Sequence, residues 1–279
     1  MFVLLWSTGF VVARYGTDDA GPFTFLSLRL AIASVMLAVV ATVTSAPRIS
    51  MAQAKWAALS GVGMHALYLG GVFLAISWGM PSGVSALIAG LHPVVTSVNA
   101  SWLLRERLNR LQWVGVGLGF AGVLVVVVDH LANASAGVTV GTLICSAVSI
   151  GGMSMGTLVQ RRRGSSMPLL WGTVTQYAAS TVVLFVALVA YEGWRFHITT
   201  RSVFALIWAL LVLSTAAVLI MLWLLQRHAA VKVSSLFFLT PALSTIESVI
   251  LFGEHLGPLV LVGLVVAGTG VSLALRAAR

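Results

Sequence analysis

Charged residues are scarce in this chain of 279 residues: 8% are Asp, Glu, Lys or Arg, whereas 59% are hydrophobic. A soluble domain carries roughly 25% charged residues, so too little charge is present to cover a surface that faces water. The mean hydropathy of +1.03 points the same way. The shortage of charge therefore excludes a soluble globular fold and indicates an integral membrane protein with lipid around much of its surface.

Cysteine and acidic residues are also rare. The single cysteine, Cys145, lies in an apolar stretch, which excludes a disulfide framework and a Cys-x-x-Cys pair. Sixteen basic residues against seven acidic ones give a net charge of +9. These basic residues occupy loops between apolar stretches, so membrane topology explains them better than binding to nucleic acid, and we expect no nucleic-acid partner.

The motifs of membrane enzymes and pumps are missing too. The sequence contains no His-Glu-x-x-His, no Gly-x-Ser-x-Gly, no pair of intramembrane aspartates and no Walker A segment. The Gly-x-Gly spacings lie inside apolar helices rather than at a strand-to-helix turn, so they indicate helix packing. We therefore expect no enzyme, no catalytic residue, no metal site and no cofactor.

Apolar stretches long enough to cross a membrane recur along the chain, because about 20 apolar residues span the hydrocarbon of a bilayer. We predict an all-α fold with ten transmembrane helices, at about 2–14, 23–44, 54–77, 82–104, 111–129, 137–160, 169–191, 202–225, 230–252 and 257–275. The first span is short, starts at Met1 without a basic flank and has no cleavage site. We therefore expect further residues upstream in the native protein rather than a signal peptide.

The distribution of Lys and Arg predicts the orientation. With the amino terminus inside, 12 of the 16 basic residues fall on the cytoplasmic side and three outside, while Arg29 lies within a span. Positive residues accumulate in cytoplasmic loops, so both termini are expected in the cytoplasm. Arg29 either reaches outward to the nearby surface, makes a structural hydrogen bond, or binds a substrate carboxylate.

An internal repeat runs through the chain at an offset of 148 residues. Residues 81–128 and 229–276 share 10 identities in 48 positions, including the pairs Pro93/Pro241, Glu106/Glu254, Gly115/Gly263 and Gly122/Gly270. We predict two five-helix repeats, 1–130 and 131–279. Because five is an odd number of spans, the second repeat is inverted in the membrane, an arrangement typical of transporters whose substrate site lies between the halves.

Polar residues inside the fourth and ninth spans form matching stripes. His92, Thr96 and Asn99 recur at i, i+4 and i+7 and so share one helix face, and Thr240, Ser244 and Glu247 repeat the spacing. Polar groups inside a bilayer usually face a cavity or the bundle interior. These six are predicted to bind substrate, Pro93 and Pro241 to act as hinges, and Glu247 to be a candidate for proton coupling.

Each of these residues also has a purely structural interpretation. The prolines can simply kink packed helices, Ser and Thr can bond the carbonyl four residues back, and Asn99 can join two helices. Three further residues complete the predicted substrate site: His65 and Tyr68, three apart in the third span, and Trp6 in the first, each with helix packing as its alternative.

The whole chain resembles the drug/metabolite transporter superfamily, in particular the branch with duplicated EamA domains. The resemblance rests on Gly83–Glu106 (GVSALIAGLHPVVTSVNASWLLRE) and Lys232–Glu254 (KVSSLFFLTPALSTIESVILFGE), together with Trp6, Ser7, Gly9 and Arg29. It implies a multi-pass carrier of the bacterial inner membrane, often an exporter of amino acids. By general likeness the chain is most similar to exporters of aromatic amino acids.

The function expected on this basis is secondary transport of a small amphipathic metabolite, most simply an amino acid, out of the cytoplasm by alternating access. Facilitated diffusion and proton coupling are both compatible with the sequence, since histidine titrates near neutral pH. An exporter of drugs or cations, or a flippase of lipid-linked substrates, is the alternative. The expected partners are the small-molecule substrate and the bilayer, and the protein is expected to act as a monomer.

Overall fold

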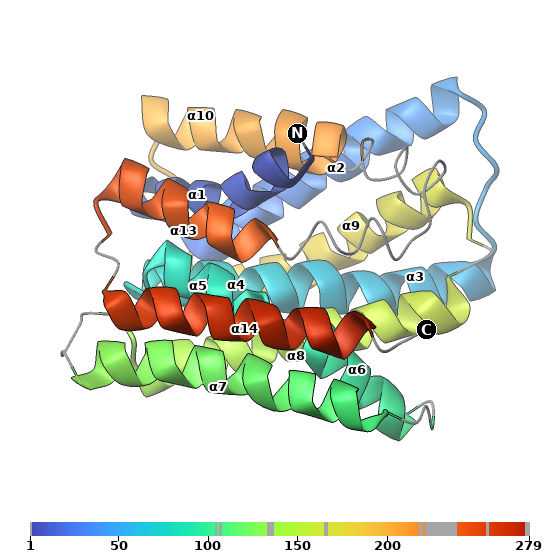
Figure 1. Ribbon diagram of the computed structural model, residues 1–279. Helices are drawn as coiled ribbons and strands as arrows, with labels where there is room; N and C mark the ends of the chain where they lie inside the picture. Colours follow the sequence, from blue (N-terminus) through green and yellow to red (C-terminus); the bar gives the residue numbers. More distant parts are fainter. Residues whose placement is uncertain are drawn as a thin grey trace.

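The computed structural model of the chain is a bundle of α-helices packed side by side (Figure 1). It describes residues 2–103, 105, 108–132, 137–164, 167–217, 220, 239–254 and 257–276. Within these ranges the sole extended pairing is an antiparallel bridge between Ala20 and Phe196. The all-α expectation is therefore confirmed, whereas Glu106 and the predicted helical stretches 221–225 and 230–238 lie outside the described residues.

Each half of the chain supplies a run of helices separated by short loops. The first half contains α1 (Phe2–Asp19), α2 (Pro22–Val43), α3 (Met51–Gly61), η1 (Val62–Leu67), α4 (Tyr68–Ser77), α5 (Ser82–Ala89), α6 (His92–Leu103) and α7 (Arg110–Ala132). The second half contains α8 (Val140–Arg163), α9 (Leu169–Ala187), η2 (Leu188–Glu192), α10 (Thr200–Trp208), η3 (Ala209–Ala216), α13 (Thr240–Phe252) and α14 (Pro258–Arg276). The η segments are π-helical turns: η1 joins α3 to α4, η2 ends the helix that α9 begins, and η3 continues α10.

Several of these rods are long and apolar enough to cross a membrane. Six meet that criterion among the described residues, at 22–43, 51–77, 82–103, 110–131, 140–163 and 169–192, and shorter apolar stretches cover 200–216, 240–252 and 258–274. The first span was predicted to close at Arg14, and this was wrong. The helix continues to Asp19. In this added turn, Oδ1 of Asp18 lies 3.9 Å from Nε of Arg14, four residues earlier on the same helix face.

Local sequence signals explain where the helices begin and end. The side chains of Ser50, Thr139 and Thr199 each accept a hydrogen bond from the backbone N–H three residues on. The backbone N–H of each donates in return to the side chain of that later residue, so donors that the first turn leaves free are satisfied. Pro22 starts α2 without losing a needed donor. At the end of α13, Gly253 adopts φ +64°, the left-handed conformation that favours glycine at a helix end.

The loops gather at two ends of the bundle (Figure 1), and the residues at these ends differ in charge. One end, here called the acidic end, carries the loops after α1, α4, α7, η2 and α13 and includes Asp18, Asp19, Glu192 and Glu254. The opposite, basic end carries the loops after α2, α6 and α8. It includes Arg48, Arg105, Arg110, Arg161, Arg162 and Arg163. Successive loops fall at opposite ends because consecutive membrane-spanning segments run in opposite directions.

Helices at equivalent positions in the two halves pack against each other. α7 lies along α14, and α2 lies along α9. Glycine permits the first of these contacts: a Cβ on Gly122 would come within 2.4 Å of the Ala267 nitrogen, and one on Gly270 within 2.2 Å of the Gly119 nitrogen. The predicted glycine packing surface is therefore present, although Gly268 faces open space and takes no part in it.

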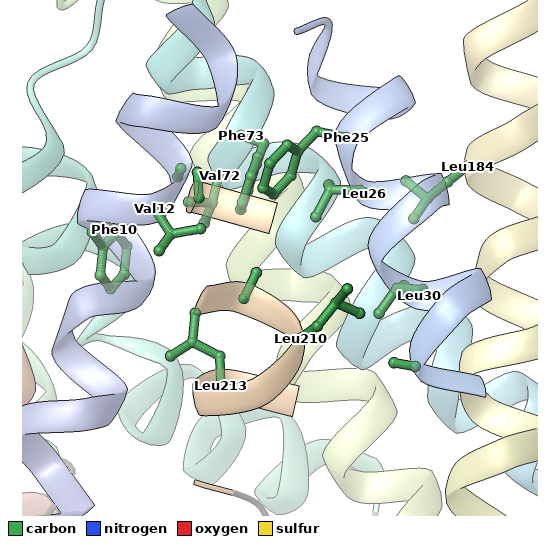
Figure 2. Close-up of a cluster of buried hydrophobic side chains, with 14 of the residues drawn as sticks. Phe10, Val12, Phe25, Leu26, Leu30, Val72, Phe73, Leu184, Leu210 and Leu213 are labelled. Carbon is green, nitrogen blue, oxygen red and sulfur yellow. The ribbon is translucent and has the colours of Figure 1, made fainter. Parts of the chain in front are cut away.

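The largest apolar cluster lies between α1, α2, α4, α9, α10 and η3 (Figure 2). Phe25, Leu26 and Phe73 are among its fully buried members, and the Phe25 and Phe73 rings stack with centroids 5.7 Å apart. Burying such side chains contributes roughly 1.5–3 kcal/mol each in water, and within a bilayer the gain comes mainly from close packing. The cluster joins helices of both halves.

Candidate functional site

The contact between α1 and α13 joins two predicted site residues of the second half, Ser244 and Glu247, to Ser7 of the first half. Ser7 Oγ donates a hydrogen bond of 2.5 Å to Oε1 of Glu247, and Ser244 Oγ donates one of 3.0 Å to the Ser7 carbonyl. Ser7 and Ser244 are fully buried. The second carboxyl oxygen of Glu247 is buried as well and has no hydrogen-bond partner among the described residues. One carboxyl oxygen therefore remains available to a ligand or a proton.

The contact between α6 and α8 is the counterpart of this one. Asn99 Nδ2 donates a hydrogen bond of 2.9 Å to Oγ of Ser154. Asn99 precedes Glu247 by 148 residues, and Ser154 follows Ser7 by 147. We refer to the Ser7–Glu247 and Ser154–Asn99 hydrogen bonds as the twin contacts, because each joins the first helix of one half to the fourth span of the other.

Ser7 and Ser154 are partners that the polar stripes did not reveal. A signal does exist in the sequence: Ser7 and Gly9 recur as Ser154 and Gly156. This match is only two residues long and is out of register by one position with the main repeat. It becomes informative only when the structure shows that both serines are buried and bonded across the halves.

The fourth span is interrupted where its proline lies. α5 ends at Ala89 and α6 begins at His92, directly before Pro93. A proline cannot donate to the carbonyl four residues earlier, here that of Ala89, so this carbonyl is left without its helical donor. Thr96 instead donates to the His92 carbonyl at 2.7 Å, so its hydroxyl is satisfied within its own helix.

Three other predicted residues lie on the helices that form the Ser7–Glu247 contact: Trp6 on α1, and Thr240 and Pro241 on α13. Thr240 is buried, and its hydroxyl has no partner among the described residues. Pro241 occupies the first turn of α13. Trp6 is half-buried on α1 and packs against the small apolar cluster that contains Val3 and Ala217. Thr240 thus adds a second unused polar atom on the same helix as Glu247.

His65 and Tyr68 lie in a different part of the bundle. His65 belongs to η1, where its ring meets that of Tyr177 edge-to-face at 4.9 Å and its Nε2 lies 3.4 Å from the Gln176 amide oxygen. Tyr68 is half-buried against the large apolar cluster. The predicted site residues therefore divide between three places: α1–α13, α6–α8, and the surroundings of η1.

A group of polar side chains surrounds η1, and most of its members were not part of the predicted site. We call Arg29, His65, Gln176, Tyr177 and Ser214 the Arg29 centre. Arg29 is only 8% exposed, and its Nε donates to Ser214 Oγ at 3.2 Å. The interpretation in which Arg29 reaches outward to the surface is therefore wrong, because the packing of α2 against α9 and η3 turns the side chain inward.

The acidic end is fastened by two carboxylates of the second half. Glu192 accepts hydrogen bonds from the backbone nitrogens of Phe23 and Thr24 at 2.9 and 3.0 Å. Glu254 accepts from the backbone nitrogens of Ser82 and Gly83 at 2.9 and 3.2 Å. Each carboxylate therefore lies at the amino terminus of a helix in the first half, where the helix dipole and free N–H groups favour negative charge.

An apolar groove of about 370 Å³ lies apart from these polar groups, between α5, α13 and α14. Its lining includes Leu87, Gly90, Pro241 and Leu264, with Thr245 and Thr269 as polar members. Thr245 donates to the Pro241 carbonyl, and Thr269 to the Val265 carbonyl. Since both hydroxyls are satisfied within their own helices, the groove offers no polar recognition, and we place the functional site at the polar contacts.

Antiparallel membrane helices, twin polar contacts across two related halves and a capped end are the features of a transporter built from repeats. The chain matches the EamA-like transporter family over residues 1–128 and 139–276. It belongs to this family and is a multi-pass inner-membrane transporter rather than an enzyme.

Several curated relatives cover nearly the whole chain. The uncharacterized transporter YvbV of Bacillus subtilis is 26% identical over 97% of this chain and 88% of its own length. A probable amino-acid metabolite efflux pump of Escherichia coli is 25% identical over 97% and 91%. A probable terminal-alkyne amino-acid exporter of Streptantibioticus cattleyicolor is 29% identical over 45% and 42%.

A solved crystal structure has the same fold. It superposes with a TM-score of 0.65 at 19% sequence identity and covers 100% of this chain and 96% of its own. At this identity the likeness describes the arrangement of the helices and does not bear on the substrate.

Proposed function

We propose that this protein is a secondary transporter that exports small amphipathic metabolites, most simply amino acids including aromatic ones. The observation that carries the proposal is the pair of twin contacts, in which Ser7 meets Glu247 and Ser154 meets Asn99. Polar pairs buried at equivalent places between two related halves provide a path for a polar solute. The names of two relatives, an efflux pump and an exporter for amino-acid compounds, support the choice of solute.

The transport path lies between residues 1–130 and 131–279, which form two inverted five-helix repeats with ten spans and both termini in the cytoplasm. The chain directions and the abundance of arginine at the basic end support this orientation. His92, Thr96, Asn99, Thr240, Ser244, Glu247, His65, Tyr68 and Trp6 bind the solute as it passes. Pro93, at the break between α5 and α6, and Pro241, in the first turn of α13, act as the hinges.

The carboxylates of the acidic end form the external gate. Glu192 and Glu254 hold helices of the first half, and the stacked Phe25 and Phe73 lie beneath them. With that end fastened, the solute enters from the basic, cytoplasmic end. Release requires these carboxylates to leave their helix termini while the cytoplasmic end closes, which is alternating access between the two repeats. One chain supplies both halves, so a monomer suffices.

Glu247 is the group suited to proton coupling. Its free carboxyl oxygen lies at the contact between the halves, and a carboxyl group can exchange a proton whereas its counterpart Asn99 cannot. In this scheme protonation of Glu247 changes its hydrogen bond with Ser7 and thus the strength of the α1–α13 contact. Transport down a gradient without a proton would leave Glu247 as a substrate-binding residue only.

The test is uptake into liposomes that contain only this protein, with labelled phenylalanine, tryptophan and threonine. Saturable uptake above empty liposomes is expected. Thr240→Leu should reduce it, because Thr240 is buried with an unused hydroxyl. The matched control Thr269→Leu should leave it unchanged, because Thr269 is exposed on α14 and bonds its own helix.

Two further labelled compounds separate the alternatives. An amphipathic amine in the same assay tests for a drug or cation exporter, and a lipid-linked sugar tests for a flippase. Transport of either compound, with no uptake of any amino acid, would contradict the proposal.

A further inference from the structure

The Arg29 centre lies where the two halves face each other at equivalent positions. Arg29 on α2 and Tyr177 on α9 are 148 residues apart, which is the offset of the internal repeat. Both residues lie on the second span of their half, and these two helices, α2 and α9, pack along each other. Residues related by a pseudo-two-fold axis meet only near that axis. The centre therefore lies close to the axis about which inverted repeats exchange conformations, the usual location of a transport site.

The π-helical turns follow the same symmetry. η1 covers Val62–Leu67, and η3 covers Ala209–Ala216, the equivalent stretch of the other half. π-helical turns are frequent at functional sites, since they widen the helix and redirect side chains. Here they supply His65 and Ser214 to the centre. Four helices from both halves thus converge on one group of polar side chains.

Arg29 carries a positive charge that the described residues do not balance. Its one hydrogen bond in that part of the chain runs from Nε to the Ser214 hydroxyl at 3.2 Å, and no carboxylate there forms an ion pair with it. Its other neighbours, Tyr177 and His65, are aromatic. A buried arginine is costly unless an anion and hydrogen bonds satisfy it. The planar guanidinium fits a carboxylate through two parallel N–H bonds.

Polar side chains lie on the side of the Arg29 centre that faces the basic end. Gln176 lies 3.4 Å from His65 and donates a hydrogen bond of 3.0 Å to the amide oxygen of Gln160, near the basic end of α8. His65 and Gln160 are both half-buried. A solute that arrives from the basic end would therefore meet these amide and imidazole groups before it reaches Arg29.

Apolar side chains close the opposite side. On each of these helices a buried apolar residue lies nearer to the acidic end than the polar one does: Phe25 than Arg29, Phe73 than His65, Leu184 than Tyr177, and Leu210 than Ser214. Figure 2 shows these four apolar side chains. This layer accepts the apolar part of an amphipathic solute while its charged end rests below. The chemistry of the centre thus matches a small monocarboxylate with an apolar side chain.

We propose that Arg29 binds the carboxylate of the transported solute, with Ser214 and Tyr177 holding the guanidinium in place and the Phe25–Phe73 layer against the apolar end. That the bound carboxylate is also transported rests on the proposed function. The binding part stands on the charge of Arg29, which has no ion-pair partner in the described part of the chain, and on its place near the pseudo-two-fold axis. It distinguishes carboxylates from the corresponding amides and amines, which lack the anionic group.

The first experiment measures binding without transport, as thermal stabilisation of the purified protein. 3-Phenylpropionate, a carboxylate without an amine, should stabilise the wild type and Arg48→Gln, an exposed loop arginine that serves as the matched control. It should not stabilise Arg29→Gln, and phenethylamine should stabilise none of the three. Equal stabilisation of wild type and Arg29→Gln by 3-phenylpropionate would overturn the proposal.

The second experiment compares uptake of phenylalanine and phenylalaninamide within each variant, so that a difference in the amount of folded protein cancels. The ratio of acid to amide should fall at least tenfold in Arg29→Gln. It should fall less in Arg29→Lys, which keeps the charge but not the paired N–H geometry and remains informative if Arg29→Gln does not fold. An unchanged ratio in Arg29→Lys and Arg29→Gln would contradict the inference while amino-acid transport stands. Carboxylate binding that depends on Arg29, with no amino-acid uptake by wild type, would support the inference and remove the proposed function.

Discussion

The twin contacts occupy equivalent places in the two halves but differ in chemistry. In one, Ser154 meets the amide of Asn99 at 2.9 Å; in the other, Ser7 meets the carboxyl of Glu247 at 2.5 Å. A hydroxyl donor makes shorter hydrogen bonds than an amide N–H, and a bond to an ionised carboxylate is roughly twice as strong as a neutral one. The α1–α13 contact is also reinforced by Ser244, which bonds the Ser7 backbone.

This difference shows how a duplicated fold can become asymmetric. Both contacts join the first helix of one half to the fourth span of the other, yet only the one with Glu247 can gain or lose a proton. In the proposed mechanism the halves supply the path in common, while the carboxyl group at Glu247 makes one side responsive to protons. The variants below break or sharpen this comparison, in order of decreasing expected effect.

The largest effect is expected where carboxylates of the second half hold the acidic end. Glu254→Gln removes the negative charge and one of the two oxygens that accept from the backbone N–H groups of Ser82 and Gly83. The contact should lose about 1.5–3 kcal/mol of interaction free energy. The acidic end should therefore open at least tenfold more often. A cysteine at Leu213, introduced together with Cys145→Ser, reports opening through its rate of maleimide labelling. Asp18→Asn is the control, since its exposed pair with Arg201 contributes less than about 1 kcal/mol; equal labelling in the two variants would exclude Glu254 as a gate.

The second effect concerns the contact between α7 and α14, to which each half contributes its last helix through glycines. Gly122→Ala should lower the free energy of unfolding of the purified protein by about 1–3 kcal/mol and so lower its melting temperature. The reason is that the added Cβ would meet backbone atoms of Gly263 and Ala267 on α14. Gly268→Ala provides the comparison, since nothing lies within 4 Å of its Cβ. If both variants melted at the wild-type temperature, close α7–α14 packing would not stabilise the fold.

The third pair of variants tests the twin contacts themselves. Hydrogen bonds between membrane helices contribute about 0.6 kcal/mol on average, so Ser154→Ala should reduce uptake about threefold. Ser7→Ala should reduce it about tenfold, because its partner is a carboxyl group and such bonds are about twice as strong. The initial rate of amino-acid uptake, normalised to the amount of folded protein, provides the readout. A larger loss for Ser154→Ala would reverse the proposed asymmetry.

The smallest effect is expected at Thr96, which lies on the predicted stripe between His92 and Asn99. Its hydroxyl donates to the His92 carbonyl of its own helix, and such bonds affect helix geometry more than recognition. Thr96→Val should therefore change the Michaelis constant for the amino acid less than about twofold, a difference below roughly 0.5 kcal/mol. A tenfold increase would show that the hydroxyl leaves its helix to contact the solute.

Periodicity and the repeat anticipate the helical architecture because both are properties of single segments. The stripes of α6 and α13 follow from 3.6 residues per turn, and the charge at the ends follows from the loops. The expectation that Asn99 and Glu247 occupy related places agrees with their contacts to Ser154 and Ser7. Their partners were not predictable, since the choice of serine depends on which helices pack against α6 and α13.

The Arg29 centre shows a second limit of sequence reasoning. Depth along α2 is the same whether Arg29 points to lipid or into the bundle, so the pattern left both outcomes open. The packing of α9 and η3 decides it, by presenting Ser214 and Tyr177. The π-helical turns that direct His65 and Ser214 inward have no signal in hydrophobic periodicity, because they insert part of a turn without altering the composition.

The measurement that tests the central claim most directly is uptake of labelled phenylalanine into proteoliposomes, with and without a pH gradient, by wild type and Glu247→Gln. Glu247→Gln makes the twin contacts chemically alike, since both then carry an amide. We predict that the gradient stimulates uptake by the wild type and that the variant keeps only the component independent of the gradient. Equal stimulation in both proteins would contradict the account, because the asymmetry between Glu247 and Asn99 would then have no role in transport.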